Sequence, residues 1–163
     1  MSQTIYQTVI DSVNTKVQED SLLKQIDTLI DYLYKKEGSI EEKVSKVMSH
    51  EYKEKITSIA EKENIDLNEP VKFQKFLEDL KEEIRKVAII NLHLSLDPSD
   101  SLVQSIASWL APNMGHKVII DVIKEPSLIG GMSISNKGVY WEHSIRKKLL
   151  EKFKSKEFLK FLK

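Results

Sequence analysis

Cysteine is absent from the 163 residues of this chain, which excludes a disulfide framework and a thiolate metal site. Long apolar runs are also missing, and none approaches the roughly 18–20 residues that a membrane-spanning helix needs. Residues 1–6 lack the basic start and the apolar core of a signal peptide. Together these absences indicate a cytoplasmic protein whose chain does not cross a bilayer.

A net charge is missing as well, because 25 basic residues balance 25 acidic ones. The balance hides a polarity, since residues 146–163 include eight basic and two acidic side chains. This segment therefore has a net charge of +6, and the residues before it have a net charge of −6. Such a chain can offer an acidic surface to one partner and a basic helix to another.

Helical periodicity dominates residues 1–87. Ser39 and Glu42 have the spacing of a capping box, and Pro70 suits the first turn of a later helix. The apolar residues that recur at helical spacing are Ile5, Val9, Ile10, Val13, Val17, Leu22, Leu23, Ile26, Leu29, Ile30, Leu33, Ile40, Val44, Val47, Tyr52, Ile56, Ile59, Phe73, Phe76, Leu77, Leu80, Ile84 and Val87. No single helix could bury such a stripe alone, so we expect an antiparallel helical bundle over residues 1–87.

The apolar period changes near Lys86, where we place a domain boundary. Residues 88–96 alternate as in a half-buried strand, with His93 on the side expected to face solvent. A helix, a second strand, a hairpin across residues 136–138 and a helix from Ser144 follow. This order predicts an α+β fold, with a small strand-helix-strand-hairpin-helix domain over residues 88–163.

No group of residues has the pattern of a catalytic or cofactor site. Gly130 and Gly131 precede a strand, whereas a phosphate-binding loop needs a lysine and a helix there, so a tight backbone path is expected. His143 and Ser144 are adjacent in sequence and therefore diverge, which favours a helix cap at residues 142–144 over a catalytic array. The histidines have no metal-binding spacing. We therefore expect no enzyme activity, no cofactor and no metal.

Tryptophans are more often core than contact residues, although Trp141 could anchor an interface.

One ordered set of motifs is more specific. Residues 125–131 have the sequence Glu-Pro-Ser-Leu-Ile-Gly-Gly, a hairpin follows, and a helix begins after residues 142–146, Glu-His-Ser-Ile-Arg. The set resembles the C-terminal signature of the delta subunit of bacterial ATP synthases, called the oligomycin-sensitivity-conferring protein in mitochondria. Glu142 stands where the family usually has aspartate. The signature residues, to which we assign a structural role, are Pro126, Ser127, Leu128, Ile129, Gly130, Gly131, Glu142, Ser144 and Arg146.

The resemblance covers about half of the chain, from Ile90 onward, while the N-terminal half agrees only in its helical character and is shorter than usual. It implies a non-catalytic peripheral-stalk subunit on the cytoplasmic face of the bacterial plasma membrane. The helical domain would bind N-terminal segments of the alpha subunits, and the α+β domain would bind the C-terminal helices of the b subunits. Candidate residues for the first contact are Ile5, Tyr6, Val9 and Val13. Candidates for the second are Leu149, Phe153, Phe158 and Phe161.

A different class of function remains open from the residues alone. A small adaptor or an RNA-binding module could combine a helical domain with an α+β domain. The basic C-terminal segment has a single arginine, however, and its lysines alternate with apolar residues, as on the solvated face of an amphipathic helix. Nucleic acid is therefore not the expected partner.

Overall fold

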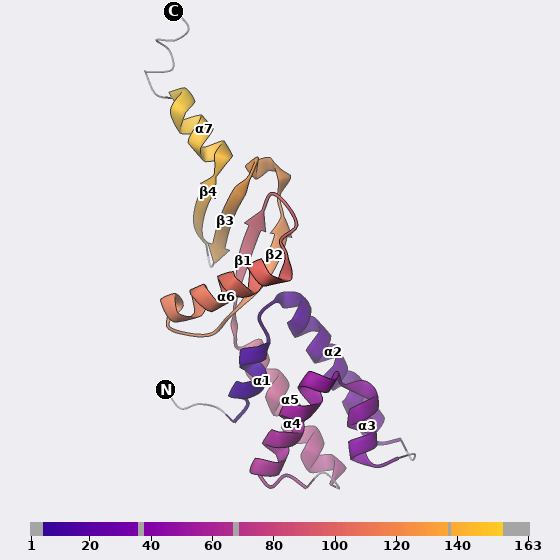
Figure 1. Ribbon diagram of the computed structural model, residues 1–163. Helices are drawn as coiled ribbons and strands as arrows, with labels where there is room; N and C mark the ends of the chain where they lie inside the picture. The colour runs from indigo at the N-terminus through magenta and orange to yellow at the C-terminus, as the bar shows by residue number, and fades with distance from the viewer. Residues whose placement is uncertain (1–4, 36–37, 67–68, 137, 155–163) are drawn as a thin grey trace, which may run out of the picture. The chain divides into compact units, whose positions relative to one another are not determined.

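The computed structural model describes residues 5–35, 38–66, 69–136 and 138–154 (Figure 1). The chain divides into two compact units, Met1–Ala88 and Ile89–Lys163, which we call unit 1 and unit 2. The described elements comprise seven α-helices and one four-stranded mixed sheet, so the α+β class is confirmed. No helix in the described ranges combines the length and the apolar character needed to span a membrane.

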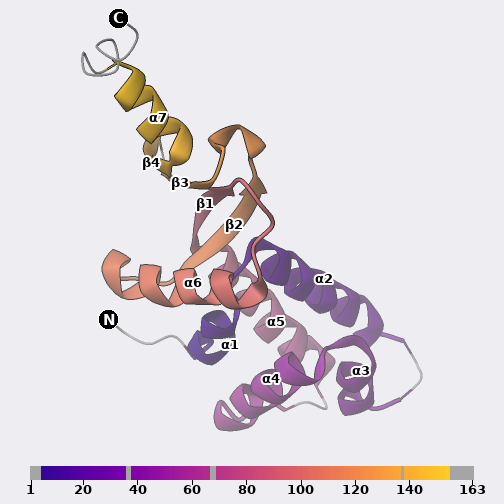
Figure 2. The ribbon, with the colours of Figure 1, turned by 45° about the horizontal axis from the view of Figure 1, so that its top comes forward.

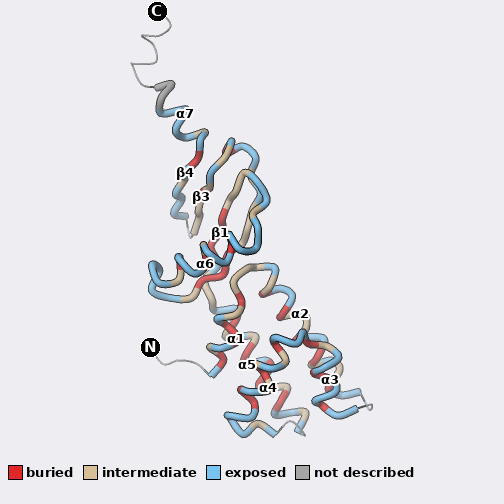
Figure 3. The backbone as a smooth tube through the Cα atoms, viewed as in Figure 1, coloured by how far each residue is buried: buried red, intermediate tan, exposed pale blue. Residues whose placement is uncertain are grey.

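Unit 1 contains helices α1 (Gln7–Ser12), α2 (Lys16–Leu33), α3 (Ile40–Val47), α4 (His50–Lys62) and α5 (Pro70–Arg85). Helix α2 packs against α3 and α5, and α4 packs against α1 and α3 (Figures 1 and 2). Buried residues recur along each helix where it turns toward its neighbours, as the red segments of Figure 3 show. The predicted stripes therefore supply most of the core of this unit.

The helix boundaries follow local capping. Ser39 accepts a hydrogen bond from the Glu42 backbone N–H at 3.2 Å, and Pro70 occupies the first turn of α5, as predicted. A complete capping box, which the sequence analysis did not predict, lies at Thr15, whose hydroxyl accepts from the Gln18 backbone N–H while the Gln18 side chain accepts from Thr15. This cap divides the first predicted apolar stripe between α1 and α2. Val17 lies on α2 instead of α1 and is 78% exposed, so its expected burial was wrong.

A buried lysine on α3 binds backbone carbonyl groups at and just beyond the end of α2. Lys43 on α3 is almost fully buried, and its ammonium donates to the carbonyl oxygens of Leu33 at 2.8 Å and Lys35 at 2.6 Å. The last carbonyls of a helix have no intrahelical donors, and the negative end of the helix dipole favours a cation there. Lys43 therefore joins α3 to the end of α2 and satisfies the Leu33 carbonyl, which would otherwise be buried without a partner.

Unit 2 is built on the sheet. Strands β1 (Ala88–Leu94), β2 (Val118–Lys124), β3 (Gly131–Asn136) and β4 (Val139–Ser144) lie in the order β2-β1-β3-β4. Strand β3 is antiparallel to β1 and to β4. Helix α6 (Asp100–Met114) connects β1 to β2 and packs against β2, and the short 3₁₀ helix η1 (Pro126–Leu128) precedes β3. Helix α7 (Ile145–Lys154) follows β4 directly and contacts both β4 and η1.

The two faces of the sheet differ in polarity. In the pairing of β1 with β3, Leu92 lies opposite Ile134 and His93 lies opposite Ser133. Because neighbouring residues of a strand point to opposite faces, the leucine and isoleucine share one face and the histidine and serine share the other. The apolar face supports α6, whose buried residues are Val103, Ala107 and Leu110. The polar face and the turn before β3 hold most of the signature residues.

Candidate functional site

The turn at residues 125–131 is fixed at both ends by hydrogen bonds. The Glu125 backbone N–H donates to the Leu94 carbonyl at 2.7 Å, at the end of β1. The Ser127 hydroxyl donates to the Glu125 carboxylate at 2.8 Å, and Leu128 is fully buried. At the other end, the Ile145 backbone N–H donates to the Gly130 carbonyl at 3.0 Å. The turn thus ties β1, η1 and the start of α7 together.

Gly130 and Gly131 have the structural role that the sequence predicted. Both have φ of +96°, a conformation that costs a side chain about 1–2 kcal/mol. A Cβ on Gly131 would lie 2.3 Å from the His143 carbonyl oxygen and 2.8 Å from Ser144 Cα, so the β3 and β4 backbones approach too closely for any side chain. A Cβ on Gly130 would meet only the mobile end of the Ile145 side chain, at 2.9 Å. The more stringent requirement for glycine is at Gly131.

Glu142 and Ser144 form the predicted helix cap. The Ser144 hydroxyl accepts from the Lys147 backbone N–H at 3.0 Å and donates to the Glu142 carboxylate. Arg146 pairs with the same carboxylate at 3.2 Å, and the Tyr140 hydroxyl donates to it at 3.2 Å. The Ser144 hydroxyl, and then Arg146, hold the pKa of Glu142 below its ordinary value of 4.5. The carboxylate therefore acts as a charged organiser of the cap.

Replacing Glu142 with glutamine is expected to destabilise unit 2 at neutral pH and to lose this effect in acid. The folded-state pKa of Glu142 is lowered, so its contribution is present above the unfolded pKa and disappears as the pH falls through the folded value. Urea midpoints of the wild type and Glu142→Gln, measured from neutral pH down to below 4.5, should converge at the acid end. Glu151→Gln, at an exposed position of α7, is the matched control. A difference that persists unchanged in acid would contradict the electrostatic role.

His93 is not on a solvated face, contrary to the prediction. Its side chain is largely buried, with Nδ1 2.9 Å from Glu125 Oε2 and Nε2 3.4 Å from the Ser135 hydroxyl. The contact with Glu125 is short enough for an ion pair but is not aligned as a hydrogen bond. A serine–histidine–acid relay needs that alignment and a closer serine, so these contacts tie β1, β3 and the signature turn together without forming a nucleophilic site.

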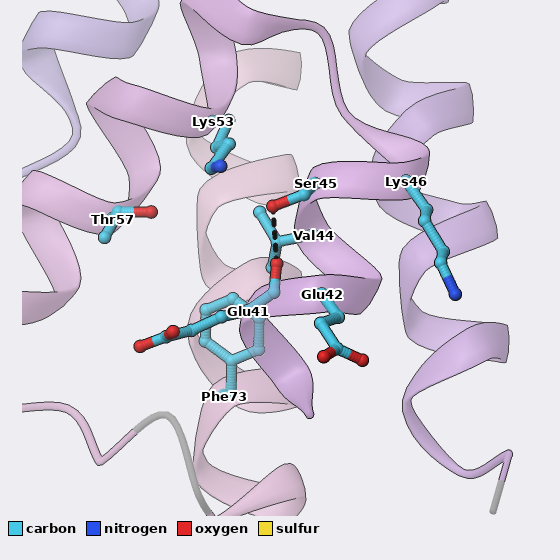
Figure 4. A pocket seen from close by; sticks show the side chains of 8 residues that line it. All are labelled: Glu41, Glu42, Val44, Ser45, Lys46, Lys53, Thr57 and Phe73. Atoms are coloured by element: carbon cyan, nitrogen blue, oxygen red, sulfur yellow. Dashed lines mark hydrogen bonds between the residues drawn. The ribbon is translucent and has the colours of Figure 1, made fainter. Parts of the chain in front are cut away.

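A hollow of about 540 Å³ lies in unit 1 between α3, α4 and α5 (Figure 4). Phe73 and Val44 supply its apolar wall, and the Ser45 hydroxyl donates to the Glu41 carbonyl at 2.7 Å. The remaining lining residues are Glu41, Glu42, Lys46, Lys53 and Thr57. The acids and lysines of the lining carry charges of both signs. The hollow therefore combines apolar and charged lining residues from three helices.

The predicted head-binding residues divide by burial. Ile5 is exposed, whereas Tyr6, Val9 and Val13 belong to the core of unit 1. The Tyr6 ring lies 5.5 Å from that of Phe76. Burial, with smaller effects from Asp79 and other acids, raises the pKa of Tyr6 to about 12. Of these four side chains, Ile5 is therefore the one available at the surface of unit 1.

Among the predicted stalk-binding residues, Leu149 lies on α7 and is 40% exposed. The side chain of Phe153, and all of Phe158 and Phe161, lie outside the described residues. Ile145 and Leu150 on the same helix are also exposed, although the prediction did not include them. Helix α7 thus presents apolar side chains to solvent beside its charged ones.

An apolar groove in unit 2 was not predicted. Trp109 is 62% exposed, so its expected core position was wrong, and Trp141 is 51% exposed, as its alternative role at an interface would require. They face a groove of about 560 Å³ between α6 and the β3–β4 hairpin. Its lining residues are Ser105, Ile106, Trp109, Leu110, Asn113, Met114, Met132, Ile134 and Trp141. One sequence signal could have revealed it, since residues 101–115 contain no Asp, Glu, Lys or Arg in a chain that is 31% charged.

Within the described part of the chain, no cluster of three or more histidine and carboxylate side chains is arranged to hold a metal ion. The sequence matches no protein-family model and no curated protein. The candidate site of this chain is therefore defined by its own geometry: the signature turn with its cap, the exposed side of α7 and the groove beside α6.

Proposed function

We propose that this chain is a peripheral-stalk subunit, similar to the delta/OSCP family, of a rotary proton-translocating ATP synthase. In this role it catalyses nothing and joins the catalytic head to the membrane-anchored b subunits, at the cytoplasmic face of a bacterial plasma membrane. The observation that carries the proposal is the ordered signature from Pro126 to Arg146.

The geometry of the signature supports the proposal. Gly131 permits the close approach of β3 to β4, Gly130 binds the start of α7 through its carbonyl, and Ser144 caps that helix. These three residues thus serve one junction between the hairpin and α7. A stator must transmit torque without yielding, and a junction with so little slack suits that requirement.

Unit 1 is proposed to be an antiparallel bundle that grips the alpha subunits. The packing of α2 against α3 and α5, and of α4 against α1 and α3, supports such a bundle. Tyr6, Val9 and Val13 hold α1 in the core, and Ile5 is the member of the stripe free to meet an amphipathic segment of the head. Unit 2 is proposed to bind b subunits through the apolar side of the last helix, at Leu149, Phe153, Phe158 and Phe161.

Recovery of partners from the source membranes tests the function. The full chain, tagged and expressed at its native level, should retain alpha and b subunits. The double variant Leu149→Ser with Phe153→Ala should lose b by about tenfold or more while keeping alpha, because two central apolar anchors contribute most of a helix-in-groove contact. Leu96→Ser, at an exposed apolar position of unit 2 outside α7, is the control and should retain both subunits.

Two outcomes would overturn the proposal. An intact ATP synthase purified without this polypeptide would exclude a stator role. Retention of the chain on nucleic acid, falling steeply with salt and accompanied by no ATP synthase subunits, would instead support the RNA-binding alternative. Loss of alpha in the Leu149→Ser, Phe153→Ala variant would contradict the assignment of the two ends.

A further inference from the structure

The groove beside α6, defined by the nine lining residues given above, has the composition of a binding interface. Its helix supplies Trp109 and Met114, and the β3–β4 hairpin supplies Met132 and Trp141. Interface cores are depleted of charged residues and enriched in aromatic residues and methionine. Residues 101–115, which form nearly all of α6, carry no charge, and neither does β3. In a chain with this many charged residues, a helix whose outer side faced only water would be expected to carry charged side chains within four turns.

The groove does not suit a small polar ligand. Its polar lining residues are Ser105 and Asn113, and the Asn113 amide already donates to the Trp109 carbonyl at 2.6 Å. Small-molecule sites orient their ligands through several convergent polar groups. Recognition of an amphipathic helix instead relies on apolar side chains that enter a groove at helical spacing. The open, apolar lining fits the second mode.

The surroundings of the groove indicate the charge of its partner. His143 stacks on Trp141 with ring centroids 5.8 Å apart, and it shares a shallow surface depression with Lys147 and Lys148. Glu142 in that depression is already paired with Arg146, and Glu151 offsets one lysine. These lysines belong to residues 146–151, which follow β4 and include three basic side chains and one acidic one. A helix lying over the hairpin and ending near α7 would therefore meet a basic rim.

No described helix of this chain is a suitable occupant of the groove. Its C-terminal segment is basic, so it has the same sign of charge as the rim and would be repelled by it. The acidic helices of unit 1 bury their apolar faces, as the fully buried Phe73, Leu77 and Leu80 of α5 illustrate. A second copy of the chain would present the same buried faces and the same basic segment.

We infer that the groove between α6 and the β3–β4 hairpin binds an acidic amphipathic α-helix of a partner chain. The inference does not rest on the proposed function, because it follows from the lining, the missing charges and the basic rim of unit 2. It places a docking surface on α6 and β3–β4, apart from the exposed side of α7.

The two tryptophans of the chain make the test direct, since both line the groove and no others exist. The full chain is titrated with a synthetic peptide of about 18 residues, long enough to form a helix, with leucine at i, i+3, i+4 and i+7 and glutamate on the opposite side. Saturable binding should shift the tryptophan emission to the blue. A twin peptide with lysine in place of glutamate should bind at least about tenfold more weakly, a difference of about 1.4 kcal/mol.

Substitutions on α6 locate the binding. Ser105→Glu places a charge in the groove and should weaken binding of the acidic peptide by about tenfold or more, because the charge is desolvated without a partner. Ser108→Glu adds the same charge at an exposed position of the same helix outside the groove and should leave the affinity within about twofold. Circular dichroism confirms that both variants retain their helix content.

Several results would overturn the inference. These are the absence of a saturable shift, equal affinity for the two peptides, or equal losses in the two variants. A blue shift that grows with protein concentration alone, with dimers in sedimentation, would assign the groove to a second copy. A red shift on truncation after Lys154, without peptide, would assign it to the chain's own C-terminal segment.

Discussion

Gly131→Ala is expected to destabilise unit 2 severely. The added methyl group would lie 2.3 Å from the His143 carbonyl oxygen and 2.8 Å from Ser144 Cα, so two paired backbones must separate. The φ of +96° adds strain for any residue with a side chain. Together these effects should cost about 3–5 kcal/mol, the range of the most severe single substitutions. Unit 2 is small enough that its total stability is about 4–11 kcal/mol at the usual stability per residue.

The readout is again provided by the tryptophans, both of which lie in unit 2. Guanidinium unfolding followed by their emission should show a midpoint far below that of the wild type, or no folded baseline. Gly138→Ala is the matched control, since Gly138 has φ of +84° but no atom within 4 Å of its added Cβ. Only strain remains there, about 1–2 kcal/mol. Similar losses at the two positions would show that the close approach of β3 to β4 is not what requires Gly131.

Local signals in the sequence predicted the elements that are stabilised locally. The hydroxyl of Ser39 and the ring of Pro70 act within one helical turn, so their spacing alone located the starts of α3 and α5. The cap at Ser144 was predictable for the same reason. The glycines of the signature turn were recognised because a strand follows them, although the contact that requires Gly131 comes from the neighbouring strand.

The failures depend on contacts between residues far apart in sequence. His93 has the alternation of a solvated position, but Glu125, 32 residues later, folds back against it. Trp109 has the spacing of a core residue on α6, yet no element of the described chain covers it, and periodicity alone gives no information on what lies opposite a stripe. Val13 and Val17 are spaced for one helix, but the Thr15 cap competes locally and divides the segment.

Phe73→Ala is expected to be the most damaging substitution in unit 1. Phe73 is fully buried, and its ring stacks on that of Phe76 at 5.9 Å. Removing a buried phenyl group costs about 3–5 kcal/mol, from lost transfer free energy and from the cavity left behind. The hollow beside Phe73 (Figure 4) would join the space that the phenyl group leaves and give the neighbouring side chains room to adjust, which favours the lower end of the range. Urea unfolding followed by far-ultraviolet circular dichroism measures the loss.

The control for Phe73→Ala is Val71→Ala on the same helix, where the side chain is 71% exposed and the expected change is within about 0.5 kcal/mol. A second readout follows from the packing of Tyr6 on Phe76, because Phe76 loses its stacked partner in the variant. Greater hydration of Tyr6 should lower its pKa from about 12 toward the ordinary 10.0, visible as earlier phenolate absorption on raising the pH. Loss of stability with an unchanged Tyr6 titration would show that α1 is held independently of the phenylalanine pair. Helix α1 would then be held in the core by Val9, Ile10 and Val13.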